Sequence, residues 1–306
     1  MQYREGFDAF AFIDCAVADG FDGVALSAND DNYRHLGGKE RRRHKAIADY
    51  IAKNGLLCDI DTSSTEPQHL STMLHVAQDV GARKLRTYTQ YQGALQDIIA
   101  QTIADLRAIA PLAADMGIVV MLENHETFTG EDIATVLEAV DSPWVRALYD
   151  YGNSQMVLEH PLDALSHMLP LSASAHIKDH VCLRAQDSPL ACDSVLGVPI
   201  GEGYLDIAAI TQQLIEGGCH HLVFENSHGY LAPIREERKT SEGLAQLGEG
   251  MFGFARAPFD PKSILLDSNK PPIDQLLDLE KAMHQRSLSY FRNEVLWPLQ
   301  NPVQDT

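Results

Sequence analysis

The sequence predicts an α/β protein with the (β/α)8 architecture of a TIM barrel, in which residues 1–306 form a single domain. From residue 21 onward, short apolar runs alternate with amphipathic segments, and seven such runs occur in series. Alternating strands and helices indicate parallel pairing with right-handed crossovers. A doubly wound sheet that binds a dinucleotide is disfavoured, because no GxGxxG motif follows the first predicted strand.

Each predicted strand is a short apolar run, and each predicted helix has apolar residues at helical spacing. The strands are expected at residues 22–27, 56–63, 84–89, 118–126, 145–151, 173–179 and 220–226. The helices between them are expected at residues 40–55, 66–82, 96–117, 131–141, 161–169 and 206–217, with a loop before the last of these. Pro67 suits the first turn of its helix, whereas Pro111 predicts a kink inside the long one.

The front of the predicted barrel departs from this regular pattern. Residues 4–20 are predicted to form a helix, so only Met1, Gln2 and Tyr3 precede it. The first strand of the barrel is therefore predicted to be short or missing. Because a missing strand would leave two parallel edges unpaired, the alternatives are an unusual short strand, another segment in its place, or a chain that starts further upstream.

The C-terminal part is also irregular. Residues 230–271 are rich in Gly and Pro and predict a long loop insertion after the last strand, whereas 272–296 predict the final helix. Met251, Phe252 and Phe254 lie in the insertion. Because this segment has no clear periodicity, we expect these three side chains to form a lid or a subunit contact rather than a separate core.

The composition restricts the partners and the compartment. A net charge of −19 and a pI near 4.9 argue against a nucleic-acid-binding surface, and the one dense basic run, residues 39–45, reads as a solvated helix face. No apolar run approaches the ~20 residues of a membrane helix, and the start lacks the apolar core of a signal peptide. Five scattered cysteines without a CxxC motif predict a reduced, cytoplasmic protein without disulfides.

Four acidic or imidazole residues stand at the ends of four successive strand-like runs. They are Glu123, Asp150, His176 and Glu225, separated by steps of 27, 26 and 49 residues. The carboxyl ends of the strands of a parallel barrel meet on one face, so these side chains are expected to converge. Together they form a hard, mostly oxygen ligand set that suits Mn²⁺, Mg²⁺ or Co²⁺, and without a cation the clustered carboxylates would repel one another. The alternative, a strand cap at an exposed loop, explains one such residue better than four in consecutive units.

Five short motifs surround or follow these residues. They are LEN at Glu123, YDYGN at Asp150, HIKD at His176, PIGEG at 199–203 and FEN at Glu225. In this order and spacing they resemble the xylose isomerase-like superfamily of TIM barrels, which contains sugar-phosphate isomerases and epimerases, inosose dehydratase and apurinic endonucleases. The resemblance covers about residues 5–229 and resumes over 275–296, where EKAMHQRSLSYFRN is similar to the family's final helix.

The resemblance implies a role for each member of the quartet. In this superfamily the matching residues bind a divalent metal that chelates vicinal oxygens of the substrate. Here we expect Mn²⁺ or Mg²⁺, with Co²⁺ or Zn²⁺ as alternatives, and no other cofactor. The metal stabilises the enediolate that forms when a proton leaves the carbon next to a carbonyl. In the epimerase branch, the residues that match Glu123 and Glu225 also remove and return that proton on opposite faces of the carbon.

Two positions depart from the pattern of the ketose 3-epimerases. Those enzymes carry a histidine three residues after the aspartate ligand, where this chain has Asn153, and an arginine six residues after the histidine ligand, where it has Cys182. The HIKD motif instead resembles phosphorylated-sugar, inositol-related and lyase-like members. Lys178 shares a strand face with His176, so it is a catalytic candidate that holds a substrate carboxylate or phosphate, or donates a proton. The alternative for Lys178 is a structural ion pair with a barrel carboxylate.

Further polar residues near strand ends are candidates for contact with the substrate, with a supporting or loop role as the alternative. They are Arg86, His125, Asn153, Arg184 and His228.

These observations predict a divalent-metal-dependent isomerase or epimerase of a small sugar, sugar phosphate or sugar acid, which works by proton transfer through a metal-stabilised enediolate. The alternative is a lyase on the same metal site, a dehydratase or decarboxylase of an oxo sugar acid or inositol derivative. A DNA-repair endonuclease is disfavoured by the charge and by the lack of additional histidine ligands, and a non-catalytic barrel by the intact quartet. We expect a small-molecule carbohydrate as the partner, no nucleic acid or membrane, and a homodimer or homotetramer.

Overall fold

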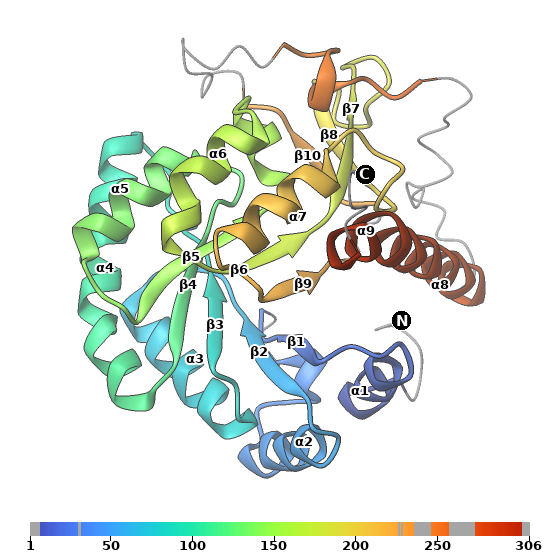
Figure 1. Cartoon of the computed structure of the whole chain (residues 1–306). Coiled ribbons are helices and arrows are strands. Elements are labelled where there is room, and N and C mark those ends of the chain that lie inside the picture. The colour runs from blue at the N-terminus through green and yellow to red at the C-terminus, as the bar shows by residue number, and fades with distance from the viewer. Residues whose placement is uncertain are drawn as a thin grey trace. The chain divides into compact units, whose positions relative to one another are not determined.

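The computed structural model describes residues 7–29, 32–225, 227, 229–235, 246–256 and 273–301. Seven parallel strands are hydrogen-bonded in the order β1-β2-β3-β4-β5-β6-β9 (Figure 1). Their bounds are Gly23–Ser27, Leu57–Asp61, Lys84–Thr87, Val119–Glu123, Val145–Asp150, Ser172–Ile177 and Leu222–Phe224. A helix lies between each two successive strands of this order, so the predicted fold class is confirmed and all seven predicted strands are present.

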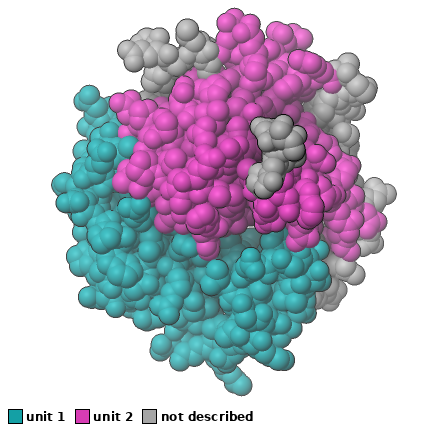
Figure 2. Space-filling model, in the orientation of Figure 1, with its two compact units in different colours: residues 1–123, 132–148 teal, residues 124–131, 149–306 magenta. Residues whose placement is uncertain are grey.

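The chain divides into two compact units, coloured separately in Figure 2. Unit 1 comprises residues 1–123 and 132–148, and unit 2 comprises residues 124–131 and 149–306. One division therefore falls directly after β4, and another falls inside β5.

Unit 1 contains the first four helices and most of the fifth. These are α1 (Ala9–Ala18), α2 (Arg41–Lys53), α3 (Pro67–Val80), α4 (Leu95–Met116) and α5 (Gly130–Val140). The strands contribute fully buried residues such as Ile60, Leu85 and Val120, and α3 contributes Leu70. The helices pack in sequence, α2 on α3 and α3 on α4, each burying one apolar stripe. Pro111 lies inside α4, which continues through it to Met116.

Helix α1 precedes the first strand of the described chain. Within the described ranges the parallel sheet begins with β1, so it has seven strands where a complete (β/α)8 barrel has eight. A short strand ahead of α1 would fall in residues 1–6, which lie outside the described residues.

Unit 2 contains a second, antiparallel sheet in the order β10-β8-β7, with β7 at Asp179–Leu183, β8 at Ser194–Val198 and β10 at Leu231–Pro233. A loop does precede α7 (Ile207–Glu216), as predicted, but the segment between β6 and α7 also contains β7 and β8, two strands that the sequence did not predict. Every residue of β7 and β8 is buried. A strand that is buried on both faces lacks the alternation of apolar and polar residues that marks a half-exposed strand.

The remaining helices of unit 2 are α6 (Pro161–Met168) and the C-terminal series. Where the sequence predicts a final helix over 272–296, α8 spans Ile273–Tyr290, a π-helical turn spans Phe291–Leu296, and α9 (Trp297–Gln300) follows. None of the helices in the described part of the chain is both long and apolar enough to cross a membrane.

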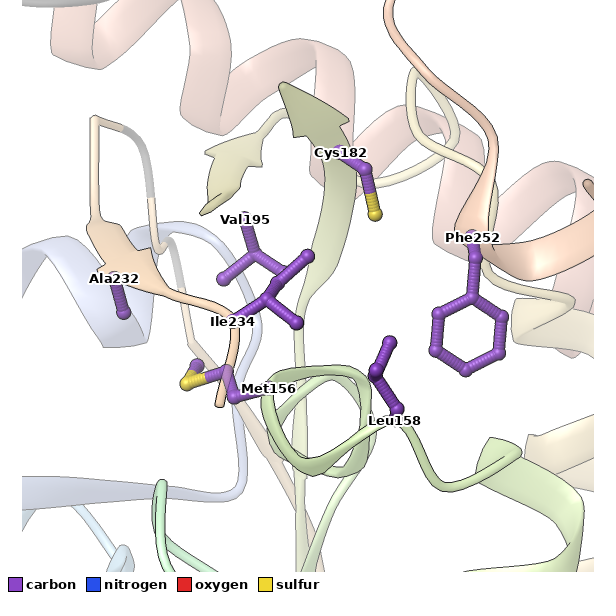
Figure 3. Close-up of a cluster of buried hydrophobic side chains, with 7 residues drawn as sticks. All are labelled: Met156, Leu158, Cys182, Val195, Ala232, Ile234 and Phe252. Atoms are coloured by element: carbon purple, nitrogen blue, oxygen red, sulfur yellow. The ribbon is translucent and has the colours of Figure 1, made fainter. Parts of the chain in front are cut away.

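The second sheet has an apolar core of its own (Figure 3). Its buried members are Met156, Leu158, Cys182, Val195, Ala232, Ile234 and Phe252. Phe252 comes from the predicted insertion, and Met251 and Phe254 pack against the cluster. The backbone N–H of Cys182 donates to the carbonyl of Gly253 at 3.0 Å, which ties this segment to β7. The structure corrects the expectation for these three side chains, because they complete a core inside unit 2.

Replacing Phe252 with alanine should lower the free energy of unfolding by about 3 kcal/mol, because the loss of a buried ring leaves a cavity in a packed cluster. Urea unfolding followed by circular dichroism measures this loss. Phe12, which is 39% exposed, provides the matched control, and Phe12→Ala should cost about 1 kcal/mol or less. Equal losses in the two variants would contradict the core assigned to Phe252.

Candidate functional site

Strand β5 delivers Asp150 to a fixed position in unit 2. The Asp150 carboxylate is fully buried, and its Oδ1 accepts backbone hydrogen bonds from Gly152 and Asn153, both at 2.9 Å. The Asn124 side chain makes two hydrogen bonds to the backbone of Asp150. Its Oδ1 accepts from the Asp150 N–H at 2.7 Å, and its Nδ2 donates to the Asp150 carbonyl at 3.3 Å. With Oδ1 held by this turn, Oδ2 faces Lys178 at 2.8 Å.

Three further side chains of unit 2 meet at Asp150. Lys178 Nζ lies 2.8 Å from both Asp150 Oδ2 and Glu225 Oε2. His176 Nδ1 lies 3.5 Å from Glu225 Oε2 and 4.0 Å from Asp150 Oδ2. Because β6 pairs in parallel with β9, the residues that follow the two strands are brought together. The structure thus joins two predicted carboxylate ligands, the predicted histidine ligand and the lysine of the HIKD motif.

The four side chains differ in exposure. Asp150, His176 and Lys178 are buried, whereas the side chain of Glu225 is 38% exposed. A buried ammonium group needs anionic partners, because an unpaired buried charge costs several kcal/mol. The ion pairs with Asp150 and Glu225, which the sequence left as an alternative for Lys178, meet this need. Glu225 is the most exposed member of the group.

The donor set fits a hard divalent cation. Two ligand atoms about 2.1 Å from an octahedral ion lie roughly 3 Å apart when adjacent and about 4.2 Å apart when opposite. The two separations from His176 Nδ1, 3.5 and 4.0 Å, fall in this range. Lys178 contacts the same two oxygens, Asp150 Oδ2 and Glu225 Oε2, so its ammonium group and a bound cation would compete for them.

In unit 1, Glu123 ends β4 with its side chain buried. Arg86 of β3 forms an ion pair with it, from Nη2 to Oε2. Arg86 Nη1 also donates to the carbonyl of Thr62 at 3.4 Å, and the guanidinium carbon lies 4.7 Å from the centroid of the Tyr88 ring. Arg86, a predicted substrate contact, therefore holds the Glu123 carboxylate in unit 1.

The other predicted substrate contacts lie in different surroundings. His125 is partly exposed after β4. Asn153 is buried, and among the described residues neither polar atom of its side-chain amide has a hydrogen-bond partner. Arg184, exposed after β7, has its guanidinium carbon 4.1 Å from the centroid of the Phe254 ring. His228 lies outside the described residues.

The fold of this chain has counterparts in known proteins. Residues 13–249 match the family model of the xylose isomerase-like TIM barrel. The chain belongs to this family. The resemblance carried by the LEN, YDYGN, HIKD, PIGEG and FEN motifs is therefore confirmed.

Two relatives of this xylose isomerase-like chain share about a quarter of the aligned residues with it. It is 25% identical over 172 residues to the uncharacterized protein YihM of Escherichia coli strain K12, a match that covers 56% of this chain and 53% of YihM. It is 26% identical over 162 residues to the 3-oxo-isoapionate decarboxylase of Pectobacterium atrosepticum, a match that covers 52% and 57% of the two chains. The chain thus spans only about half the length of these relatives.

A solved structure extends the likeness over nearly the whole chain. The crystal structure of D-psicose 3-epimerase in the presence of D-fructose matches with a TM-score of 0.63, covering 94% of this chain and 93% of that one at 14% identity. At this identity the likeness concerns the fold alone, and it agrees with the TIM-barrel class.

A buried carboxylate next to Lys178, which the sequence motifs did not single out, holds a turn beside the site of this xylose isomerase-like chain. Asp179 follows Lys178, and its Oδ2 accepts backbone hydrogen bonds from Gly201 and Gly203, both at 2.9 Å. Its Oδ1 accepts from the backbone of His180 at 2.9 Å and of Leu205 at 3.2 Å. Burial raises the pKa of Asp179, and the four N–H donors lower it. The effect of burial is larger, so the pKa is about 7. Both motifs involved, HIKD and PIGEG, were visible, but nothing in the sequence pairs them.

An aromatic group beside Lys178 was also missed. The ring of His180 stacks on that of Tyr230, with centroids 6.0 Å apart and planes at 20°. Burial lowers the pKa of His180 to about 3, and its Nδ1 lies 3.2 Å from Gln155 Oε1. The Tyr230 hydroxyl donates to Glu126 Oε1 at 2.5 Å, and Arg235 Nη2 lies 3.4 Å from Glu126 Oε2. Burial raises the pKa of Tyr230 far above its usual range, so this phenol is neutral.

Replacing Asp179 with asparagine should lower the free energy of unfolding by roughly 2 to 4 kcal/mol, because an amide NH₂ cannot accept the two N–H bonds made to one carboxylate oxygen, and each buried donor left unpaired costs about 1 to 3 kcal/mol. Urea unfolding measures the loss. The exposed Asp187 provides the control, and Asp187→Asn should change stability by about 0.5 kcal/mol or less. A loss no larger than that of the control would show that Asp179 does not hold the turn.

Proposed function

We propose that this chain is a divalent-metal-dependent isomerase or epimerase of a small sugar, sugar phosphate or sugar acid. The observation that carries the proposal is the convergence of Asp150, His176, Lys178 and Glu225 in unit 2, at the carboxyl ends of β5, β6 and β9. Active sites of TIM-barrel enzymes are built at the carboxyl ends of the strands.

We propose Asp150, His176 and Glu225 as metal ligands and Glu123, buried at the end of β4, as the fourth. Buried carboxylate and imidazole side chains, such as these residues provide, are groups that could hold a metal ion. A mostly oxygen set favours Mn²⁺ or Mg²⁺, with Co²⁺ or Zn²⁺ as alternatives. When bound, the cation would withdraw charge from a substrate carbonyl and so acidify the neighbouring C–H.

Glu225 is the proposed group that exchanges a proton with the substrate carbon. Asp150 is fully buried, and its Oδ1 accepts two backbone N–H groups, so it suits a fixed ligand. Glu225 has the same chemistry with more than a third of its side chain exposed. A carboxylate within reach of the substrate can act as general base and then as general acid. Glu123 is the proposed second carboxylate, which would return the proton on the opposite face.

Lys178 is proposed to orient the substrate. An ammonium group held between two carboxylates presents N–H donors to a substrate carboxylate, phosphate or hydroxyl. His125, Asn153 and His228 remain proposed substrate contacts. Arg86 and Arg184 are also proposed substrate contacts; in the structure Arg86 pairs with Glu123 and Arg184 lies over the ring of Phe254.

A lyase is the second candidate, and one specific observation favours it. The relative of stated activity, at 26% identity over about half of each chain, is a 3-oxo-isoapionate decarboxylase. The chain also has Asn153 and Cys182 where ketose 3-epimerases carry histidine and arginine. A decarboxylase or dehydratase would use the same cation and Lys178 to hold an oxo sugar acid or inositol derivative while CO₂ or water leaves.

We also propose a cytoplasmic location and a homodimer or homotetramer. All five cysteines are free thiols, and a reducing compartment suits such a set. The net charge of −19 supports a small-molecule partner in preference to a nucleic acid.

Replacing His176 with alanine should weaken the binding of Mn²⁺ by at least about tenfold, because even residues that only support metal ligands contribute tenfold or more to affinity. Isothermal titration calorimetry of the full chain measures the affinity, and circular dichroism confirms that the variant is folded. His167 is exposed on α6, and His167→Ala is the matched control with unchanged affinity. Unchanged affinity and stoichiometry in the His176 variant would place the metal elsewhere.

Replacing Glu225 with glutamine should reduce kcat by roughly 10²- to 10⁴-fold, because an amide of the same size cannot take up the proton. The assay uses D₂O, added Mn²⁺, and a panel of ketoses, ketose phosphates and 3-oxo sugar acids. Nuclear magnetic resonance follows deuterium at the α-carbon, and mass spectrometry follows CO₂ or loss of water.

Deuterium uptake with an unchanged carbon skeleton supports the isomerase or epimerase, and release of CO₂ or water supports the lyase. Glu216, exposed at the end of α7, provides the control variant Glu216→Gln with unchanged turnover. A Glu225 variant as active as the native chain would remove Glu225 from the proposed proton transfer.

A further inference from the structure

The Lys178 ammonium group has an aromatic neighbour as well as anionic ones. Nζ lies 5.6 Å from the centroid of the Tyr230 ring and 2.8 Å from both Asp150 Oδ2 and Glu225 Oε2. A cation within about 6 Å of an aromatic face is attracted by the ring quadrupole. The ammonium group therefore lies between two carboxylates and a π face, all from unit 2.

The Tyr230 ring is held by contacts that do not involve Lys178. Its hydroxyl donates to Glu126 Oε1 at 2.5 Å and lies 3.8 Å from Met156 Sδ. Its backbone carbonyl accepts the N–H of Gly197, on β8, at 2.7 Å. The loop that carries Tyr230 is thus tied to both the turn after β4 and the second sheet, and this fixes where the ring face lies.

The charges around the ring leave its face available to the ammonium group. Glu126, which accepts the hydroxyl hydrogen bond, is itself 3.4 Å from Arg235 Nη2. His180, stacked on the ring, is neutral because burial lowers its pKa to about 3. A neutral imidazole does not compete with Lys178 for the ring's negative face.

We propose that Tyr230 is a positioning residue, which holds the Lys178 ammonium group so that Asp150 and Glu225 can be shared between Lys178 and a divalent cation. This inference rests on the proposed metal site. The oxygens that contact Lys178 are proposed ligand atoms, so a stronger hold of the ammonium group on them opposes binding of a cation. The ring offsets part of that hold, because it attracts the ammonium group without occupying a carboxylate.

A double-mutant cycle on the full chain tests the proposal. The four proteins are the native chain, Tyr230→Leu, Lys178→Met and the double variant, with Tyr230→Phe as the matched control that keeps the ring and loses the hydroxyl. Calorimetric titration with Mn²⁺ alone measures the affinity of each protein, and urea unfolding without added metal measures its stability. Circular dichroism confirms that each variant is folded.

Tyr230→Leu should weaken Mn²⁺ binding roughly three- to tenfold in the native background. In the Lys178→Met background the same change should alter the affinity by less than about twofold, because the ammonium group on which the ring acts is gone. Tyr230→Phe should stay within about twofold of the native chain, since the π face remains and the backbone bond from Gly197 still holds the loop. Equal weakening in both backgrounds would show that the ring acts on the site independently of Lys178. No weakening in either background would show that the ring does not position Lys178. Both results overturn the proposal.

The stability measurement separates this inference from the metal site. If the native chain binds no Mn²⁺, the proposed metal site is wrong. Urea unfolding then tests by itself whether the Tyr230 ring contacts the Lys178 ammonium group. A smaller loss of stability from Tyr230→Leu in the Lys178→Met background than in the native background supports the contact between ring and ammonium group. Equal losses in the two backgrounds overturn it.

Discussion

The site in unit 2 depends on the pairing of the Lys178 ammonium group with the carboxylates of Asp150 and Glu225. Burial of any one of these charges alone would be costly, yet Asp150 and Lys178 are both buried. The two contacts of 2.8 Å compensate that cost and bring residues from three strand ends to one place. They also constrain function, because any cation or substrate that takes these oxygens must do so beside a positive charge.

The scaffold around this group restrains it from several directions. The turn after β5 gives Asp150 Oδ1 two N–H donors, so its other oxygen is aimed at the site. Asp179 binds the turn that contains Gly201 and Gly203 to the start of β7, immediately after Lys178. A side chain at Gly203 would lie 2.0 Å from Asp179 Oδ1, so only glycine allows this approach. Rigid support of this kind is what a site needs to hold reacting groups in register.

The repeating part of the fold and the candidate ligands could both be predicted from the sequence. Apolar runs and helical spacing are local patterns, and all seven parallel strands appear where those patterns occur. β7 and β8 could not be predicted, because strands buried at every position show no alternation. The place of Phe252 could not be predicted either, because too few residues of its segment join the second core. The predicted ligands Asp150, His176 and Glu225 converge because the ends of adjacent parallel strands share one edge.

The sequence by itself determined the fold class, the family and the identity of the candidate ligands, since each of these depends on local runs of residue types and on their order along the chain. Only the tertiary structure decided which partners the charged groups find. The hydroxyl of Tyr230 bonds Glu126 across 104 residues, and Asp179 reaches backbone groups 22 to 26 residues away. Such contacts depend on the direction of side chains and on the packing of segments far apart in the chain. No local pattern encodes the distance between two such segments, so Tyr230 and the partners of Lys178 became visible only in the folded chain.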